Sequence, residues 1–299
     1  GVRLASSLKL TADSVKGNLT INNPNYNYSG RALNTNIEST NTDKLKDSGY
    51  ETSKVGVSIG TNFEEYENLY FSPNISVASE KINTDTKASA ALRKQDGSFF
   101  ETKFSYNLDY DLRNKRYRTT DGTRSVFSQG IPLISDNYSF ANSYEITKWH
   151  EFENKMVSDL GFYVKAINSI TDQDVKISNR LILPKHRLRG FESGMVGPRD
   201  GEDYVGGNYA MSVNYNSTLP MLLPTFENVD VKYFLDFANL WGVDYSSTVD
   251  QSSTIRSSTG LTVNWFTPVG PLNFSFSQNL LKDKKDVTEA FQFNLGTTF

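Results

Sequence analysis

The stretch Val229-Asp230-Val231-Lys232-Tyr233-Phe234-Leu235-Asp236-Phe237-Ala238 alternates strictly between two kinds of side chain. Its odd-numbered positions are all apolar or aromatic, whereas its even-numbered positions include Asp230, Lys232 and Asp236. Successive side chains of a β-strand point to opposite faces, so a period of two indicates a strand with one apolar and one polar face. We therefore expect residues 229–239 to form a strand.

The same alternation recurs along the chain, in residues 55–60, 104–110, 208–216 and 272–277. The polar face of these segments consists mostly of Asn, Ser, Gly and Thr, whereas the charged residues crowd the connections, as in 43–47, 81–94 and 282–286. A soluble sandwich would more often carry Lys and Glu on its outer face. A wet interior, an apolar exterior and charges at the strand ends are instead typical of a transmembrane β-barrel.

The composition agrees with this interpretation. The chain has 299 residues, a mean hydropathy of −0.49 and 13% aromatic residues, and it contains no cysteine. It has no run of about 18 apolar residues, so no helix is expected to span a membrane, and a closed barrel remains the spanning solution. The net charge of −3, with basic runs broken by Asp, argues against a nucleic-acid partner.

The alternation predicts an all-β fold, a transmembrane antiparallel β-barrel with about fourteen strands in a single domain over residues 1–299. The expected strands lie near 2–10, 15–22, 30–39, 50–60, 68–79, 98–111, 123–131, 138–148, 156–167, 205–217, 229–239, 255–266, 271–279 and 289–299. Many connections alternate between short and long, as in membrane barrels. Pro73 lies inside an expected strand, where proline interrupts the ladder, so we expect a bulge or a strand boundary there.

The last stretch, residues 289–299, ends on an aromatic residue. Phe291, Phe293, Leu295 and Phe299 would share one face of this strand. A terminal aromatic on an alternating strand resembles the C-terminal targeting signal of bacterial outer-membrane barrels. The alternative is an ordinary terminal strand.

The longest expected connection, near 168–204, contains Leu188-Arg189-Gly190-Phe191. Together with Gly197-Pro198 and 205–208, this motif resembles the sixth extracellular loop of the BamA-type barrel-assembly family, which folds back into the barrel. Three further stretches resemble the same family in the same order: residues 23–30, 234–241 and 265–272. Arg-Gly-Phe alone is a weak motif, but the ordered combination is specific.

The resemblance implies further properties. Family barrels have sixteen strands, and the match begins at the third, so we expect the first two strands and the preceding periplasmic POTRA domains to be absent; a natural fourteen-strand relative is the alternative. The family's lateral gate is proposed to lie between its first and last strands. This chain would contribute the last strand only.

The resemblance also implies a function. It predicts a non-enzymatic insertase in the outer membrane of a Gram-negative bacterium, with unfolded outer-membrane proteins as clients and with outer-membrane lipids and accessory assembly lipoproteins as partners. A polypeptide-secreting pore of the two-partner type and a passive porin are the alternatives. A porin would not need the Arg-Gly-Phe loop.

Arg189 would need a carboxylate partner inside a lumen, because an unpaired desolvated charge is costly. Asp236 lies on the polar face of its strand, and a guanidinium can bind a carboxylate through two parallel hydrogen bonds. We therefore expect Arg189 and Asp236 to tie the loop to the wall, with Gly190 allowing a sharp turn and Phe191 packing beside it. Family members place a second carboxylate where this chain has the neutral Asn216. The alternative is a solvated surface Arg189.

Nothing in the sequence indicates catalysis. His150 and His186 lie in expected connections without the spacing of metal ligands, and residues 190–194 lack the spacing of a nucleophile elbow around Ser193. We expect no enzyme activity, no cofactor and no metal.

Overall fold

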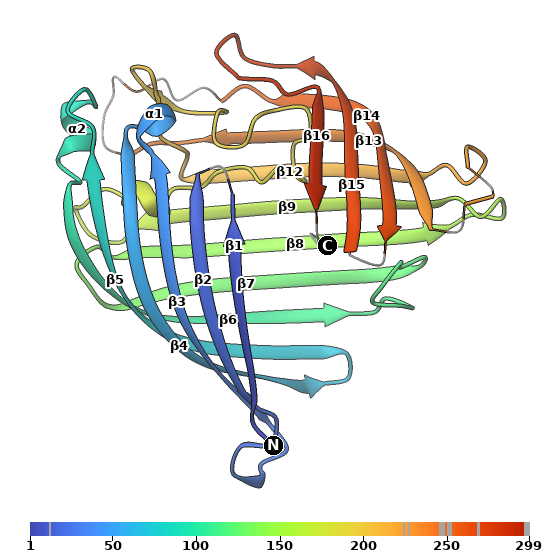
Figure 1. Ribbon diagram of the computed structural model, residues 1–299, viewed down its shortest axis with the longest axis horizontal. Coiled ribbons are helices and arrows are strands. Elements are labelled where there is room, and N and C mark those ends of the chain that lie inside the picture. The colour runs from blue at the N-terminus through green and yellow to red at the C-terminus, as the bar shows by residue number, and fades with distance from the viewer. Residues whose placement is uncertain are drawn as a thin grey trace.

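A computed structural model describes residues 1–11, 13–223, 225–226, 228–244, 249, 253–267 and 270–295. These residues form one antiparallel sheet of fourteen strands in the order β1-β2-β3-β4-β5-β6-β7-β8-β9-β12-β13-β14-β15-β16, and a small hairpin, β10-β11. The sheet curls on itself (Figure 1). Within the described ranges, no ladder joins β1 to β16, the two edge strands.

The first nine strands follow one another as up-and-down neighbours. They are β1 (Arg3–Leu10), β2 (Ser14–Asn23), β3 (Ala32–Lys44), β4 (Tyr50–Tyr66), β5 (Leu69–Thr84), β6 (Gly97–Asp111), β7 (Gly122–Ser135), β8 (Ser139–Glu151) and β9 (Val157–Ser169). The remaining strands are β10 (Arg199–Asp200), β11 (Asp203–Tyr204), β12 (Tyr209–Thr218), β13 (Val229–Trp241), β14 (Arg256–Thr267), β15 (Gly270–Leu281) and β16 (Phe291–Leu295). The helical turns are η1 (Tyr26–Tyr28), α1 (Leu45–Ser48), α2 (Ala90–Arg93) and η2 (Ile177–Asn179).

The sheet has two distinct ends because its strands run alternately up and down. The end that carries α1, α2 and the long connection 170–208 is called the loop end here, and the opposite end, with connections such as 24–31 and 152–156, the turn end. In Figure 1 the long connection, in yellow, passes among the strand ends near α1 and α2. We call residues 170–208 the anchoring loop.

The two faces of the strands differ as the alternation predicts. In β13, Phe234 and Asp236 are fully buried on the inner face, whereas Tyr233 and Phe237 are exposed on the outer face. Apolar residues are exposed on the outside of other strands as well: Val55, Val57 and Ile59 in β4, Ile75 and Val77 in β5, and Phe276 in β15. An apolar outer band of this kind suits contact with lipid tails.

Several strand boundaries differ from the prediction. β3, β4 and β5 continue to Lys44, Tyr66 and Thr84, because the backbone ladder extends past the residues that alternate. β12 begins only at Tyr209 and β16 only at Phe291. The bulge expected at Pro73 is wrong: Pro73 pairs with Tyr106 in an unshifted register, and the irregularity between β4 and β5 lies at Glu64/Tyr66 instead.

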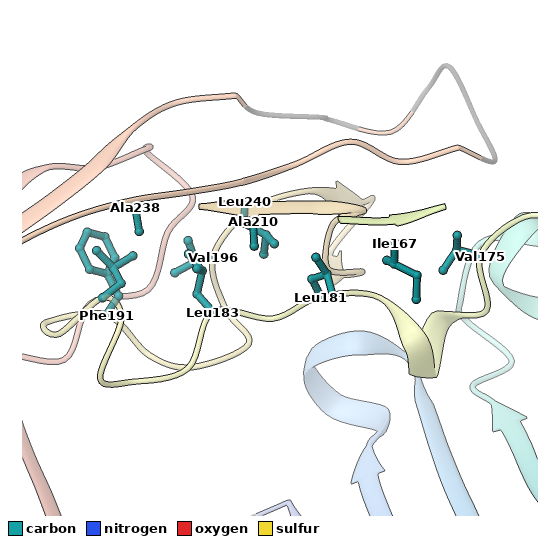
Figure 2. Packing of buried hydrophobic residues seen from close by; sticks show 10 residues of the cluster. Ile167, Val175, Leu181, Leu183, Phe191, Val196, Ala210, Ala238 and Leu240 are labelled. Atoms are coloured by element: carbon teal, nitrogen blue, oxygen red, sulfur yellow. The ribbon is translucent and has the colours of Figure 1, made fainter. Parts of the chain in front are cut away.

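The apolar core lies between the inner wall and the anchoring loop. Loop residues Leu183 and Phe191 lie beside Ala210, Ala238 and Leu240 of the wall, as Figure 2 shows. The loop is therefore packed into the curved sheet and is part of the fold. Among the described helices, none has the length and apolar character needed to cross a membrane.

Candidate functional site

The Arg189 side chain binds Asp236 of β13 through two parallel hydrogen bonds. Nε donates to Oδ2 at 2.8 Å, and Nη2 donates to Oδ1 at 2.6 Å. The backbone N–H of Arg189 also donates to Oδ2, at 3.0 Å. Asp236 is fully buried. Charge-assisted pairs of this geometry fix direction as well as distance, so the contact, which we call the clamp, sets where the tip of the loop meets the wall.

Neighbouring side chains complete the clamp. Asn216 of β12 accepts a hydrogen bond from Arg189 Nη2 at 2.8 Å and donates one to Asp159 Oδ2 at 2.7 Å. Asn214 donates to Asp236 Oδ1 at 2.8 Å. The guanidinium carbon lies 3.8 Å from the centre of the Phe234 ring, a cation–π contact. The neutral Asn216 thus joins Arg189 to the carboxylate of a third strand, β9.

Gly190 makes a turn that a larger residue could not make without strain. Its φ is +83°, and a Cβ here would lie 2.9 Å from Cβ of Ser277. Its carbonyl accepts hydrogen bonds from Asn279 Nδ2 at 2.8 Å and from the N–H of Glu289 at 3.0 Å. The glycine therefore allows the loop backbone to approach the wall closely. Leu188 and Phe191, on either side of the Arg-Gly pair, are both buried.

Sequence reasoning missed four further ion pairs that join the anchoring loop to other described parts of the chain, and one of them places Lys185 Nζ 3.0 Å from Glu289. Lys176 Nζ lies 2.5 Å from Glu80 of β5, Arg187 lies 2.5 Å from Glu145 of β8, and Arg180 pairs with Asp244, which follows β13. In each pair the loop supplies the cation and the wall or a neighbouring connection supplies the carboxylate. A signal was available, because residues 175–189 contain five Lys or Arg and no Asp or Glu.

Among the titratable groups near the loop, Asp244 and His186 have lowered pKa values. Burial opposes ionisation of Asp244, but the Arg180 guanidinium and the Val175 N–H outweigh it and hold the Asp244 pKa below its usual value. Burial, reinforced by the charge of Arg187, lowers the pKa of His186.

A cavity of about 940 Å³ lies beside the clamp, inside the sheet. Arg189, Asn216 and Thr262 line one part of it, and Arg118 and Phe226, from turn-end connections, line another. Arg118 reaches Asp230 of β13 at 2.6 Å. The anchoring loop thus occupies one part of the interior of the curved sheet, and the cavity extends from the clamp to the turn end. Within the described parts of the chain, no group of three His, Asp or Glu could hold a metal ion.

The last strand presents its aromatic residues outward. Phe291 and Phe293 are about half exposed and pack on Phe276 and Phe274 of β15, with ring centres 5.2 Å apart in each pair. The backbone of Leu295 completes β16. The side chain of Leu295 and the whole of Phe299, the terminal aromatic of the expected signal, lie outside the described residues.

Similar folds occur among solved structures. BamA from Haemophilus ducreyi lacking POTRA domains 1–3 has a TM-score of 0.85 at 22% identity, over 98% of this chain and 64% of that chain. CdiB from Acinetobacter baumannii has a TM-score of 0.56 at 11% identity, over 98% and 60%. At these identities the likeness concerns the fold alone. It confirms the expected all-β outer-membrane barrel of about fourteen strands in this chain.

Sequence relatives point the same way. The outer membrane protein assembly factor BamA of Neorickettsia risticii is 25% identical over 84% of this chain and 34% of its own length. BamA of Neisseria meningitidis serogroup B is 30% identical over 38% and 17%, and a SAM50-like protein of Schizosaccharomyces pombe is 25% identical over 71% and 47%. The chain spans at most about a third of the two BamA proteins. The model of the Omp85 superfamily domain matches residues 1–299, and the chain therefore belongs to the Omp85 superfamily.

Proposed function

We propose that the chain is the barrel of a bacterial outer-membrane protein assembly factor, which accepts unfolded barrel proteins and helps their strands to insert. The observation that carries the proposal is the Arg189–Asp236 clamp, which holds a returning loop against the inner face of the sheet. A passive pore has no need for such a loop.

The physical basis of insertion would be strand addition. An edge strand offers free N–H and C=O groups, and an incoming strand can pair with them by β-augmentation. The last strand, β16, pairs with β15 on one side. On its other side it pairs with no strand among the described residues. Folding of the client would supply the free energy, so neither a nucleotide nor a metal is needed.

The proposed partners follow from this activity. They are unfolded outer-membrane proteins as clients, outer-membrane lipids around the exposed apolar band, and accessory assembly lipoproteins. The bacterial outer membrane is the proposed location. It is supported by the bacterial relatives, although one similar protein comes from a yeast.

A polypeptide-secreting pore of the two-partner type is the second candidate. Two observations favour it: the fold likeness to CdiB and the cavity of about 940 Å³ that reaches from the clamp to turn-end residues. Such a pore would conduct ions strongly once the anchoring loop is displaced, and it would serve one dedicated substrate.

The deciding experiment is depletion of the full-length protein in its own cell. Folded outer-membrane barrels would then be counted by their heat-modifiable migration in gels. A general loss of folded barrels is expected. If barrels stay normal and a single secreted polypeptide disappears, the protein is a secretion pore and the assembly proposal is wrong.

A further inference from the structure

The tip of the anchoring loop forms backbone hydrogen bonds with the segment that leads into the last strand. The N–H of Glu192 donates to the carbonyl of Val287 at 3.0 Å, and the N–H of Glu289 donates to the carbonyl of Gly190 at 3.0 Å. Between them, Phe191 and Thr288 form an antiparallel bridge. The N–H of Val287 also donates to the carbonyl of Met195, at 3.2 Å. The loop tip and residues 287–289 therefore behave as a short two-stranded ribbon.

A side chain of β16 itself also contacts the loop. Gln292 Nε2 donates to the carbonyl of Phe191 at 3.0 Å, and Gln292 is almost fully buried. The same Nε2 also donates to Glu289 Oε2 at 3.2 Å. Loss of a hydrogen-bond partner by a buried amide is costly. Within the described residues β16 covers Phe291–Leu295, and it pairs with β15 on one side. The loop thus supplies a substantial part of what holds the beginning of this strand.

A second buried ion pair anchors the same segment from its other end. Arg256, at the start of β14, donates from Nε to Asp286 Oδ2 at 2.8 Å and from Nη2 to Oδ1 at 3.1 Å. Both side chains are buried, at 0% and 2% exposure. Arg256 Nη1 also reaches Asn239 Oδ1 of β13 at 3.1 Å. Asp286 directly precedes the ribbon, so the segment is fixed to the wall where the ribbon begins.

From these contacts we infer, on the basis of the proposed function, that the clamp and the Arg256–Asp286 ion pair together position the last strand. Arg189–Asp236 fixes the loop tip to β13, the loop tip holds residues 287–292, and Arg256–Asp286 holds the entry to that segment. Arg256, Asp286 and Gln292 are positioning residues for β16, the strand on which a client strand would pair. Release of the loop tip from Asp236 loosens β16, and a client strand can then pair with β16 more easily.

Hydrogen exchange of the full-length protein in lipid vesicles tests the linkage directly. In Asp236→Asn, peptides covering residues 287–295 are expected to exchange about tenfold faster, because the local opening of these residues together with the loop tip then requires less free energy. Asp109→Asn is the matched control. It weakens the Arg124–Asp109 pair, which has the same two-bond geometry but lies on β6 and β7. Faster exchange in residues 183–196 with unchanged exchange in 291–295 would overturn the inference.

Two further variants keep the test decisive if Asp236→Asn does not fold. Gln292→Leu leaves both ion pairs intact and removes the Gln292 bonds to the Phe191 carbonyl and to Glu289 Oε2, so exchange is expected to rise in residues 291–295 and to stay unchanged at 183–189. Asp286→Asn should loosen the same strand, and Asp286→Glu, which keeps the carboxylate, should restore most of the protection. Unchanged exchange of β16 in both Gln292→Leu and Asp286→Asn would contradict the positioning role.

A functional readout separates this inference from the proposed function. The rate at which an unfolded barrel protein inserts would be measured in the same vesicles. We expect Gln292→Leu to change that rate while the variant stays folded by heat-modifiable migration. If the unaltered protein inserts no client, the proposed function fails, whereas the exchange data still decide whether the loop holds β16. If the unaltered protein inserts clients and Gln292→Leu loosens β16 without changing the rate, the link to insertion is wrong.

Discussion

The inner face of the sheet is built differently in its first strands and in its last strands. In β2 and β3, polar side chains bond to each other across the strands: Thr20 donates to Asn36 at 2.7 Å, and Asn22 donates to Asn34 at 2.6 Å. These residues stay partly exposed. In β13 and β14, Asp236 and Ser258 are fully buried, and both bind Arg189 of the anchoring loop.

The difference shows two ways in which a lumen-facing polar residue finds a partner. A partner on the next strand is supplied by the ladder itself and leaves water nearby to replace it. A partner on the loop excludes water, so the loss of one member leaves a buried group unpaired, which costs far more than the contact contributes. We therefore expect equivalent substitutions to have small effects in β2 and β3 and large effects in β12–β14.

The largest effect is expected for Asp236→Asn, which removes a buried charge that binds the largely buried guanidinium of Arg189. Breaking one member of such a pair costs about 3–5 kcal/mol of unfolding free energy. Urea unfolding of the barrel in lipid vesicles measures it. Asp109→Asn, in a half-exposed pair, should cost about 1 kcal/mol or less. Equal losses of unfolding free energy in the two variants would contradict the larger cost expected for a buried partner on the loop.

Asn216→Ala is expected to rank next. Asn216 bonds to the charged Arg189 and to Asp159, and hydrogen bonds to charged groups contribute about 1.5–3 kcal/mol each. The comparison variant is Asn22→Ala, which breaks one bond between neutral amides and should cost about 0.5–1.5 kcal/mol. The same urea experiment ranks the two, and a larger loss for Asn22→Ala would reverse the comparison.

Gly190→Ala should cost about 1–3 kcal/mol, because a side chain at a φ of +83° is strained and its Cβ would meet Ser277. Gly30 offers a matched control in the first half of the sheet. Its φ is +72°, but no atom lies within 4 Å of a Cβ built there, so Gly30→Ala carries the backbone strain alone. Thermal unfolding of the two variants, Gly190→Ala and Gly30→Ala, separates the effect of backbone strain from that of the close contact with Ser277. If the two melting temperatures fall equally, Ser277 makes no contribution.

The sequence analysis predicted the parts of the molecule that local periodicity governs. Alternation identified the inner face of β13, and the inner position of Asp236 followed from it before any partner was known. The pairing of Arg189 with Asp236 came from the family resemblance together with charge balance. Strand ends were less accurate, because β3 and β4 continue as hydrogen-bonded ladders where the side chains no longer alternate.

The missed contacts have a common physical reason. Arg256 and Asp286 lie 30 residues apart and meet only because β14 and β15 form a hairpin whose ends bring them together. The sequence predicted that the strand begins at residue 205. Instead, Gly207 forms an isolated bridge with Leu181 of the loop, and Gly206 has a φ of +70°. Such partners depend on the register of distant segments, which the composition of either segment does not reveal.

The smallest effect is expected when the pH is lowered and the Arg180–Asp244 ion pair is lost. The folded-state pKa of Asp244 is lowered, so its pair with Arg180 stabilises the loop at pH values above the ordinary pKa of the carboxyl group, 3.8. This stabilisation is lost as the pH falls through the lower, folded-state pKa. Because Asp244 is partly exposed, about 1 kcal/mol or less is at stake. Proteolysis of residues 175–182 of the anchoring loop at decreasing pH should show faster cleavage in the acid range. In Asp244→Asn, cleavage should be fast at every pH, and a variant that keeps the acid-dependent step would assign it to another carboxyl group.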